Sequence, residues 1–405
     1  MMLSDPIQDE SKIMIDFDPY SIEFANNPYP LYRQLRDEAP VFYHEGLDFY
    51  ALSRYADVVA AHQDHDTFSS SSGPTIEKME DQMLLITKDN PEHRFHKALV
   101  TKVFTRDRMN NMESFVRGLC VDLLEKAAAN DEFDFVNDFA VELPLTVISE
   151  LIGIPEEFRR DIHNFANITL LRGDVDPAKL MQAQAAAHDT YMELIRHRRA
   201  HPRDNDVITL MMNAELEDDQ GVVRRLTDEE MAARFMELAL AGHETVAKAI
   251  PNGATALQLF PDQRAKLLGD RALIPNAVEE ILRYEPPSQL QGRITTRDVE
   301  VHGVMIPKGV KTMLLTGAAT RDERRFENPD AFDVTRDNDV VAIYFGYGIH
   351  RCLGIHLARL EIRVGLEELL SRFPQYEVFP ERGARKVLTN VRGFASLPCR
   401  AGAHA

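Results

Sequence analysis

Helical periodicity dominates the chain from about residue 94 to residue 283, and this feature constrains the fold most. Over that stretch apolar residues recur at the three- and four-residue spacing of a helix face. Only Pro155, the pair at 204–205 and Gly221 interrupt the pattern. Most of the chain is therefore predicted to form a helical body.

A smaller part of the chain shows alternation and turn residues typical of β structure. The segment 298–317 carries Gly303, Pro307 and Gly309 among alternating apolar residues, which predicts a hairpin followed by a strand. At 405 residues the chain exceeds the size at which one core usually stops growing, yet no repeat, low-complexity linker or clean boundary divides it. The sequence thus predicts a mainly α fold with a smaller β-rich part, which together could enclose a ligand.

The charge balance narrows the range of partners. The chain has 65 acidic and 46 basic residues, a formal net charge of −19. Because phosphate backbones repel such a protein, we expect no nucleic-acid partner. No apolar run approaches the length that spans a bilayer, and residues 1–19 resemble neither a secretory nor a transit signal. We expect a cytoplasmic protein without a membrane anchor.

Three cysteines, Cys120, Cys352 and Cys399, are too few for a disulfide framework. Only Cys352 has neighbours that suggest chemistry, in the stretch FGYGIHRCLG at 345–354. The apolar residues that follow are spaced along one helix face, so Cys352 is predicted at a helix N-terminus. The partial positive charge of a helix N-terminus stabilises a thiolate.

The neighbours of Cys352 limit what its thiolate can do. Glycines at 346, 348 and 354 allow unusual φ angles and the close approach of a flat ligand. The thiolate is either a nucleophile or a metal ligand. A zinc site would need three more ligands, and no second Cys or His pair has suitable spacing. Haem iron fits better, while the alternative is an inert cysteine after a glycine-rich turn.

The stretch FGYGIHRCLG resembles the haem-binding signature of the cytochrome P450 monooxygenases, whose iron is held by a cysteine thiolate. The resemblance implies that Cys352 is the axial ligand of haem b. It also implies that Phe345, beside Gly346, shields the thiolate and that His350 meets a haem propionate. The implied structure is the cytochrome P450 fold, with haem buried between a long central helix and the Cys-bearing helix. We expect one such domain over residues 1–405, with helical ranges of about 90–285 and 352–373 and β-rich ranges of about 40–60, 295–320 and 375–400.

A second stretch, AGHETV at 241–246, lies on a predicted helix that begins with a Thr-x-x-Glu capping box at 227–230. The family places an acid–threonine pair here, over the oxygen-binding face of its central helix. By resemblance, Thr245 holds O2 and Glu244 connects it to protons from solvent. The simpler alternative is a threonine bonded back to the carbonyl four residues earlier, beside a solvated glutamate. Pro251 is expected to kink or end this helix near residue 249.

A third stretch, EEILRYEPP, has Glu280 and Arg283 three residues apart on a predicted helix. Alone, this spacing indicates an exposed helical ion pair worth about 0.2–0.5 kcal/mol. Its position before a β segment and ahead of Cys352 matches the Glu-x-x-Arg motif of the family. The resemblance implies a buried pair tied to the loop around Arg336, with a structural role.

The remaining implied haem contacts are basic. In KDNPEHRFHKAL, His93 and Lys97 are four residues apart at the start of a predicted helix. The family usually has His and Arg here, and a lysine lacks the planar fork of arginine. Arg293, after the double proline, matches the other propionate-binding arginine of the family. Each of these residues could instead be an ordinary surface charge.

The implied reaction is insertion of one oxygen atom from O2 into an apolar organic molecule, by hydroxylation or epoxidation. Three cysteines cannot build a ferredoxin module, so electrons are expected from a separate ferredoxin with an NAD(P)H-dependent reductase, and we expect a monomer. Two alternatives remain open: a peroxide-driven or isomerase-type haem-thiolate enzyme, and a non-catalytic haem sensor or carrier. The expected substrate-pocket residues are mostly apolar: Leu85, Ile86, Leu240, Ala241, Leu290 and Phe394.

Overall fold

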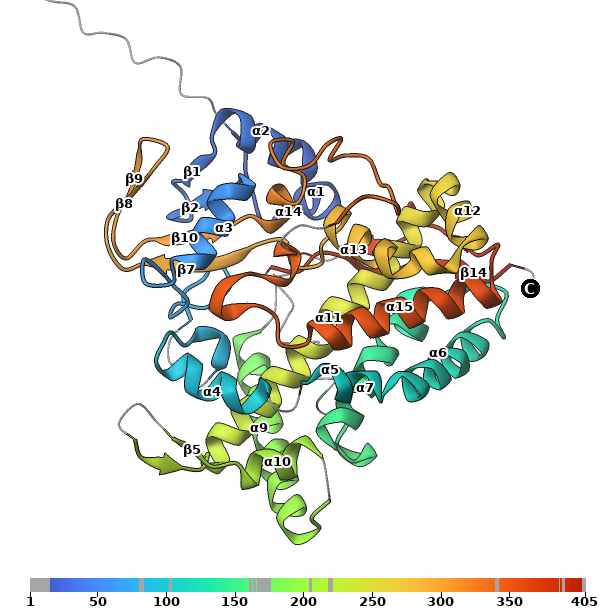
Figure 1. Cartoon of the computed structure of the whole chain (residues 1–405), viewed down its shortest axis with the longest axis horizontal. Coiled ribbons are helices and arrows are strands. Elements are labelled where there is room, and N and C mark those ends of the chain that lie inside the picture. The colour runs from blue at the N-terminus through green and yellow to red at the C-terminus, as the bar shows by residue number, and fades with distance from the viewer. Residues whose placement is uncertain are drawn as a thin grey trace, which may run out of the picture.

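A computed structural model describes residues 15–79, 84–101, 104–159, 162, 165, 176–203, 206–217, 221–338, 342–385, 387 and 390–402. Within these residues a large helical body adjoins a smaller part built around a β-sheet (Figure 1). The prediction of a mainly α fold with a smaller β-rich part is confirmed. None of the described helices is both long and apolar enough to cross a membrane.

The long helix α11, Asp228–Leu259, runs through the helical body and packs against α7, α9 and α15 (Figure 1). Thr227 and Glu230 form the predicted capping box at its start. We expected Pro251 to kink or end the helix near residue 249, but the helix does not end there. Residues 246–257 are all buried, so packing on every side offsets the hydrogen bond that Pro251 cannot make.

The other helices surround α11 and bury their apolar faces in one large core. Cys120 on α6 belongs to this core, as its apolar neighbours predicted. Several helices begin at capping side chains, such as Asp206 before α10. The helical elements of the body are α4 (Glu92–Thr101), α5 (Arg106–Asn110), α6 (Glu113–Ala127), the π-helix η2 (Phe135–Ala140), α7 (Glu142–Ile152), α9 (Pro177–Ala200), α10 (Val207–Asn213), α12 (Pro261–Gly269), η3 (Arg271–Leu273), α13 (Ile274–Tyr284) and α15 (Ile355–Arg372).

The largest sheet has the strand order β1-β2-β10-β7-β3. Strand β10 is parallel to β2 and antiparallel to β7, and Thr312 on β10 lies opposite Arg293 on β7. Short helices cover this sheet and share two smaller cores with it. The elements are β1 (Val41–His44), β2 (Phe49–Leu52), β3 (Phe68–Ser69), β7 (Gln291–Thr295), β10 (Lys311–Leu314), α1 (Ile22–Asn26), α2 (Tyr29–Glu38), α3 (Tyr55–Gln63) and α14 (Thr316–Ala319).

The remaining strands form small hairpins and ladders. The hairpin predicted in the segment 298–317 is confirmed as β8 (Val299–Val301) and β9 (Val304–Ile306), with β10 as the following strand. The others are β5 (Leu216–Glu217) with β6 (Val223–Arg224), β11 (Glu377–Val378) and β4 (Phe133–Asp134) on either side of β14 (Pro398–Arg400), and β12 (Ala384–Arg385) with β13 (Phe394–Ser396). Short 3₁₀ turns complete the fold: η1 (Leu85–Thr87), η4 (Ile343–Phe345) and η5 (Gly348–His350).

Candidate active site

The loop that carries Cys352 folds back on itself just before α15. The Cys352 N–H donates to the Phe345 carbonyl oxygen at 2.9 Å, which closes the loop. Gly346 and Gly348 have φ angles of 69° and 67°, which a side chain disfavours. A Cβ at Gly348 would lie 2.3 Å from the carbonyl oxygen of His62. The glycines of the motif are therefore required by backbone conformation and by close packing.

Cys352 lies two residues before Gly354, the N-cap of α15. The residue keeps accessible surface, yet surrounding protein atoms raise the pKa of its thiol by desolvation. The Gly354 N–H, followed by Lys97, acts in the opposite direction on that pKa. A side chain that is both accessible and closely surrounded lies in a recess, so we call this place the Cys352 recess.

Basic side chains gather near the Cys352 loop from four separate segments, and we call them the basic cluster: His62, His93, Lys97, Arg293 and His350. Arg293 on β7 approaches His62 Nδ1 with its Nη2 at 3.3 Å. The rings of His93 and His350 have their centroids 4.2 Å apart. Within the described residues, no carboxylate forms an ion pair with any member of this cluster. An anion is the group that such a site accommodates.

The pKa values of these side chains reflect their burial and the lack of carboxylate partners. Burial, with the neighbouring Arg293 second, lowers the pKa of His350 to about 2 and that of His62 to about 3. Burial and then Lys97 lower the pKa of His93 to about 4. Burial lowers the pKa of Arg293 to about 10. The three histidines are therefore uncharged at neutral pH, while Arg293 keeps a positive charge that an added anion would stabilise.

Lys97 has a different environment from the rest of the basic cluster. Its ammonium donates to the Ile349 carbonyl oxygen and, at 3.4 Å, to that of Arg351. Lys97 therefore ties α4 to the main chain of the Cys352 loop. Burial lowers its pKa, and the Cys352 sulfur is the nearest group that raises it.

On α11, Glu244 and Thr245 face different surroundings. Glu244 is 8% exposed and pairs with Lys248 one turn later, at 3.1 Å between Oε1 and Nζ. Thr245 is partly accessible, and among the described residues its hydroxyl makes no hydrogen bond back along the helix. A Cβ at Gly242 would lie 2.8 Å from Ile148, so this glycine allows α7 to approach α11 closely. The simpler alternative of a back-bonded threonine beside a solvated glutamate does not match this arrangement.

Glu280 and Arg283 on α13 form a fully buried ion pair, with Nε and Oε2 2.7 Å apart. Arg336 reaches the same carboxylate at 3.2 Å. The Arg283 guanidinium also donates to the carbonyl oxygens of Thr320, Pro329 and Ala331. The pair thus ties α13 to the segment 320–336, which leads toward the Cys352 loop.

Comparisons with known proteins agree with this arrangement. The model of the family described as Cytochrome P450 matches residues 145–400. A Mycobacterium bovis protein named as a cytochrome P450 is 38% identical over 94% of this chain and 96% of its own length.

This chain belongs to the cytochrome P450 family. Its activity is that of a cytochrome P450 monooxygenase. The vitamin D(3) 25-hydroxylase of Pseudonocardia autotrophica is 35% identical over 95% of this chain and 96% of its own length. A Bacillus megaterium protein solved in complex with corticosterone has a TM-score of 0.83 and 30% identity, over 94% of this chain and all of that one. A Chondromyces apiculatus P450 structure has a TM-score of 0.86 and 32% identity, over 96% of this chain and all of that one.

The residues of this P450 fit the haem that its family implies. The accessible Cys352 thiol provides a ligand atom. His62 Nε2 and His350 Nε2 are buried without a hydrogen-bond partner within the described residues. Together with Arg293 they offer donors and positive charge to carboxylates such as haem propionates.

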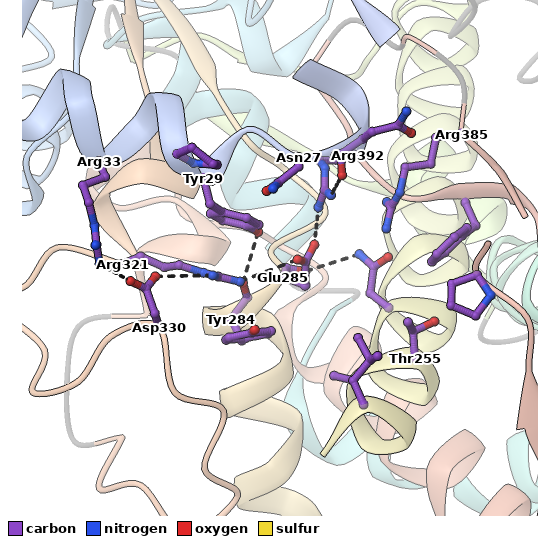
Figure 2. Close-up of a pocket in the computed structure, with 17 residues that line it drawn as sticks. Asn27, Tyr29, Arg33, Thr255, Tyr284, Glu285, Arg321, Asp330, Arg385 and Arg392 are labelled. Carbon is purple, nitrogen blue, oxygen red and sulfur yellow. Dashed lines mark hydrogen bonds and ion pairs between the residues drawn. The ribbon is translucent and has the colours of Figure 1, made fainter. Parts of the chain in front are cut away.

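The expected substrate-pocket residues do not all come together in this P450. Leu85 and Ile86 on η1 donate their N–H groups to the two carboxylate oxygens of Glu237 on α11, each at 2.8 Å. Because Glu237 lies one turn before Leu240 and Ala241, these four residues share one region. Leu290 instead packs in the core under the large sheet. Phe394 lines a separate recess with Arg385 and Thr255 (Figure 2).

Three residues near the site escaped the sequence analysis. His62 lies in the last turn of α3, far from any motif, and only the tertiary fold places it beside Arg293. Lys248 pairs with Glu244, and the i, i+4 spacing of opposite charges on one helix could have predicted that pair. Glu237 meets Leu85 across about 150 residues of chain, for which the sequence carries no local signal.

Proposed function

We propose that this P450 inserts one oxygen atom from O2 into an apolar organic substrate with haem b as its cofactor. The observation that carries the proposal is the accessible Cys352 beside a buried basic cluster that lacks carboxylate partners. The cluster supplies what two propionates need, and Cys352 supplies the ligand on the iron side. When bound, haem supplies the redox chemistry that activates O2.

Each residue of the Cys352 loop has one proposed task. Cys352 ligates the iron, and the Gly354 N–H stabilises its thiolate. Phe345 and the turn at Gly346 cover the sulfur and exclude water. Arg293, His350 and His93 bind the propionates, with His62 as a further donor. Lys97 holds the loop in position through its two carbonyl contacts.

Proton supply is the proposed task of α11. The Thr245 hydroxyl is accessible and makes no hydrogen bond along the helix, so it can donate into the Cys352 recess. Glu244 lies one residue before it and can return a proton to that hydroxyl from solvent. Lys248 holds the Glu244 carboxylate at 3.1 Å and thereby fixes its position.

The apolar surroundings favour an apolar substrate. Leu85, Ile86, Leu240 and Ala241 offer hydrophobic contacts where η1 meets α11, and apolar walls with few polar groups are usual for ligand sites. Names of relatives and solved structures state vitamin D(3), corticosterone, testosterone, erythromycin B and a hexadecenoic acid carried by acyl carrier protein. We therefore propose a large, mostly apolar substrate. We also propose that a separate ferredoxin and its NAD(P)H-dependent reductase deliver electrons to a cytoplasmic, single-domain monomer.

Reduction of the haem-bound protein under carbon monoxide tests the proposal. We expect the absorption spectrum of thiolate ligation, and Cys352→His is expected to give that of imidazole ligation. A panel of steroids and fatty acids, screened for shifts of the ferric spectrum, is expected to single out bulky apolar molecules. A protein that stays colourless after haem supplementation, or an unchanged spectrum in Cys352→His, would contradict the assignment.

A further inference from the structure

A second recess, with a volume of about 760 Å³, lies against the C-terminal part of α11 (Figure 2). This volume is in the range of small-molecule sites. Its wall on α11 consists of Asn252, Thr255, Ala256 and Leu259, which share one helix face. At about 1.5 Å per residue, Thr255 lies about 15 Å along the helix from Thr245. Cys352 and the basic cluster are absent from the described residues that line it.

Most of the charge in this second recess is already matched. Asp330 pairs with Arg33 and, at 3.4 Å, with Arg321. Glu285 pairs with Arg392 and, at 3.6 Å, with Arg321. Figure 2 shows these contacts meeting around the Arg321 side chain. Both carboxylates of the recess are thus engaged by arginines, and among the described residues neither forms an ion pair with a fourth, although Glu285 is close enough to raise the pKa of that arginine.

Arg385 is that fourth arginine. Among the described residues its side chain makes no hydrogen bond, and its Nη1 is buried without a partner. The guanidinium lies 4.0 Å over the ring of Phe394, which orients it in the recess. Burial, with Arg392 as the second cause, lowers its pKa to about 10, so it is still a cation at neutral pH. Arg385 itself is half-buried, and a cation in such a place, with a buried Nη1 and no hydrogen-bond acceptor, is stabilised when an anion joins it.

Two uncharged polar side chains on α11 also lack a hydrogen-bond partner among the described residues. Asn252 is 2% exposed and its Oδ1 has no partner within the described residues, and Thr255 is 8% exposed with an unpartnered Oγ1. Apolar surface lies beside them on Ala256, Phe394 and Leu259, of which Leu259 is 63% exposed. One unmatched cation, a hydroxyl group that can donate and an apolar wall suit a monoanion with an apolar body, whereas Asn252 Oδ1 can only accept.

We propose that this second recess binds an organic carboxylate whose carboxyl group meets Arg385 and Thr255 and whose apolar part lies on Phe394 and Leu259. The site is separate from the Cys352 recess, so both can be filled at once. It shares α11 with Glu244 and Thr245, so its ligand contacts the helix that carries the proposed proton path.

Calorimetric titration with octanoate tests this site, with octanamide as the uncharged molecule of the same shape. Phenylimidazole is present to occupy the haem iron, and the visible spectrum shows that it stays bound. Octanoate is expected to bind, and octanamide about 10- to 100-fold more weakly, as for loss of a charged hydrogen bond. Arg385→Gln is expected to weaken octanoate binding by the same factor, and Thr255→Val about fivefold.

Arg382→Gln is the matched control, because Arg382 lies three residues away and pairs with Glu132. It is expected to bind octanoate like the parent protein, and Arg385→Lys is expected to bind it better than Arg385→Gln. The site would be refuted by equal binding of octanoate and octanamide, by unchanged binding in both Arg385→Gln and Thr255→Val, or by no octanoate binding while the iron is occupied. A normal carbon monoxide spectrum in the same sample would separate that failure from a failure of the proposed function.

Discussion

Two buried groups of polar and charged residues differ in whether their charges have ion-pair partners within the protein. We call the Glu280–Arg283 group the completed pair and the basic cluster the incomplete cluster. Around Glu280, the carboxylate is shared by Arg283 and Arg336, and the remaining guanidinium donors reach main-chain carbonyl oxygens. In the basic cluster, burial and then the charge of Arg293 lower the pKa values of His62 and His350, so these histidines are neutral at neutral pH and Arg293 is a buried cation. Among the described residues, no acidic side chain is paired with that cluster.

This difference separates residues that serve the fold from residues that serve binding. A buried ion pair whose partners are all present needs nothing further, and removing one partner leaves a buried charge. A buried cation without an anion is unfavourable alone and becomes favourable when an anionic ligand enters. Both groups satisfy a family motif, but only the second implies a missing partner.

The largest expected effect is on the completed pair. Arg283→Ala should destabilise the protein by about 3–5 kcal/mol, because it leaves the Glu280 carboxylate in a site with no solvent access. Urea unfolding of the protein, with and without haem, measures this loss, which should be similar in both forms. The double variant Glu280→Ala with Arg283→Ala should lose less than the sum of the single variants. Additive losses would show that the two residues do not act as a pair.

The next effect concerns the incomplete cluster. Arg293→Gln should leave the haem-free protein as stable as the parent, or more so, because it removes a buried positive charge that has no ion-pair partner among the described residues. It should weaken haem retention by about 1.5–3 kcal/mol, the usual contribution of a charged hydrogen bond. Transfer of haem to an excess of apomyoglobin measures the retention, and Arg293→Lys should restore part of it. If Arg293→Gln retained haem as well as the parent and its haem-free form lost much stability, Arg293 would serve the fold, as the completed pair does, and not haem binding.

The same contrast explains what the sequence could predict. The Cys352 motif, the Glu280–Arg283 spacing and the Thr227 capping box are local patterns, and each forms locally in the structure. Helices and the β8–β9 hairpin were predictable for the same reason, since their periodicity and turn residues are read over short windows.

Features that depend on tertiary contacts were not predictable. His62 joins the basic cluster because α3 ends beside β7, and nothing in its own segment indicates this. Pro251 lies inside α11 because neighbours on all sides stabilise the helix, although the residue type alone predicts a break. The placement of Phe394 in the second recess likewise depends on how β13 turns.

The smallest expected effect concerns Glu361, a buried ionisable residue that has no ion-pair partner among the described residues. Glu361 on α15 is fully buried, and both of its carboxylate oxygens lack hydrogen bonds within the described residues. Burial raises its pKa well above the ordinary value. Because the folded state then binds the proton more tightly than the unfolded state, stability is full below about pH 4.5 and declines as pH rises.

Glu361→Gln should therefore be more stable than the parent by about 1–3 kcal/mol at neutral pH, because the amide does not carry the proton-linked cost that burial imposes on the carboxyl group. Thermal unfolding between pH 5 and pH 8 should show a difference that grows with pH, since the variant cannot ionise. Glu368→Gln, two turns along the same helix, is the control, because Glu368 pairs with Arg117 at 2.6 Å and the variant should lose stability instead. If the stability difference between Glu361→Gln and the parent did not change with pH, Glu361 would be ionised throughout. It would then act as a buried anion, as Glu280 does in the completed pair.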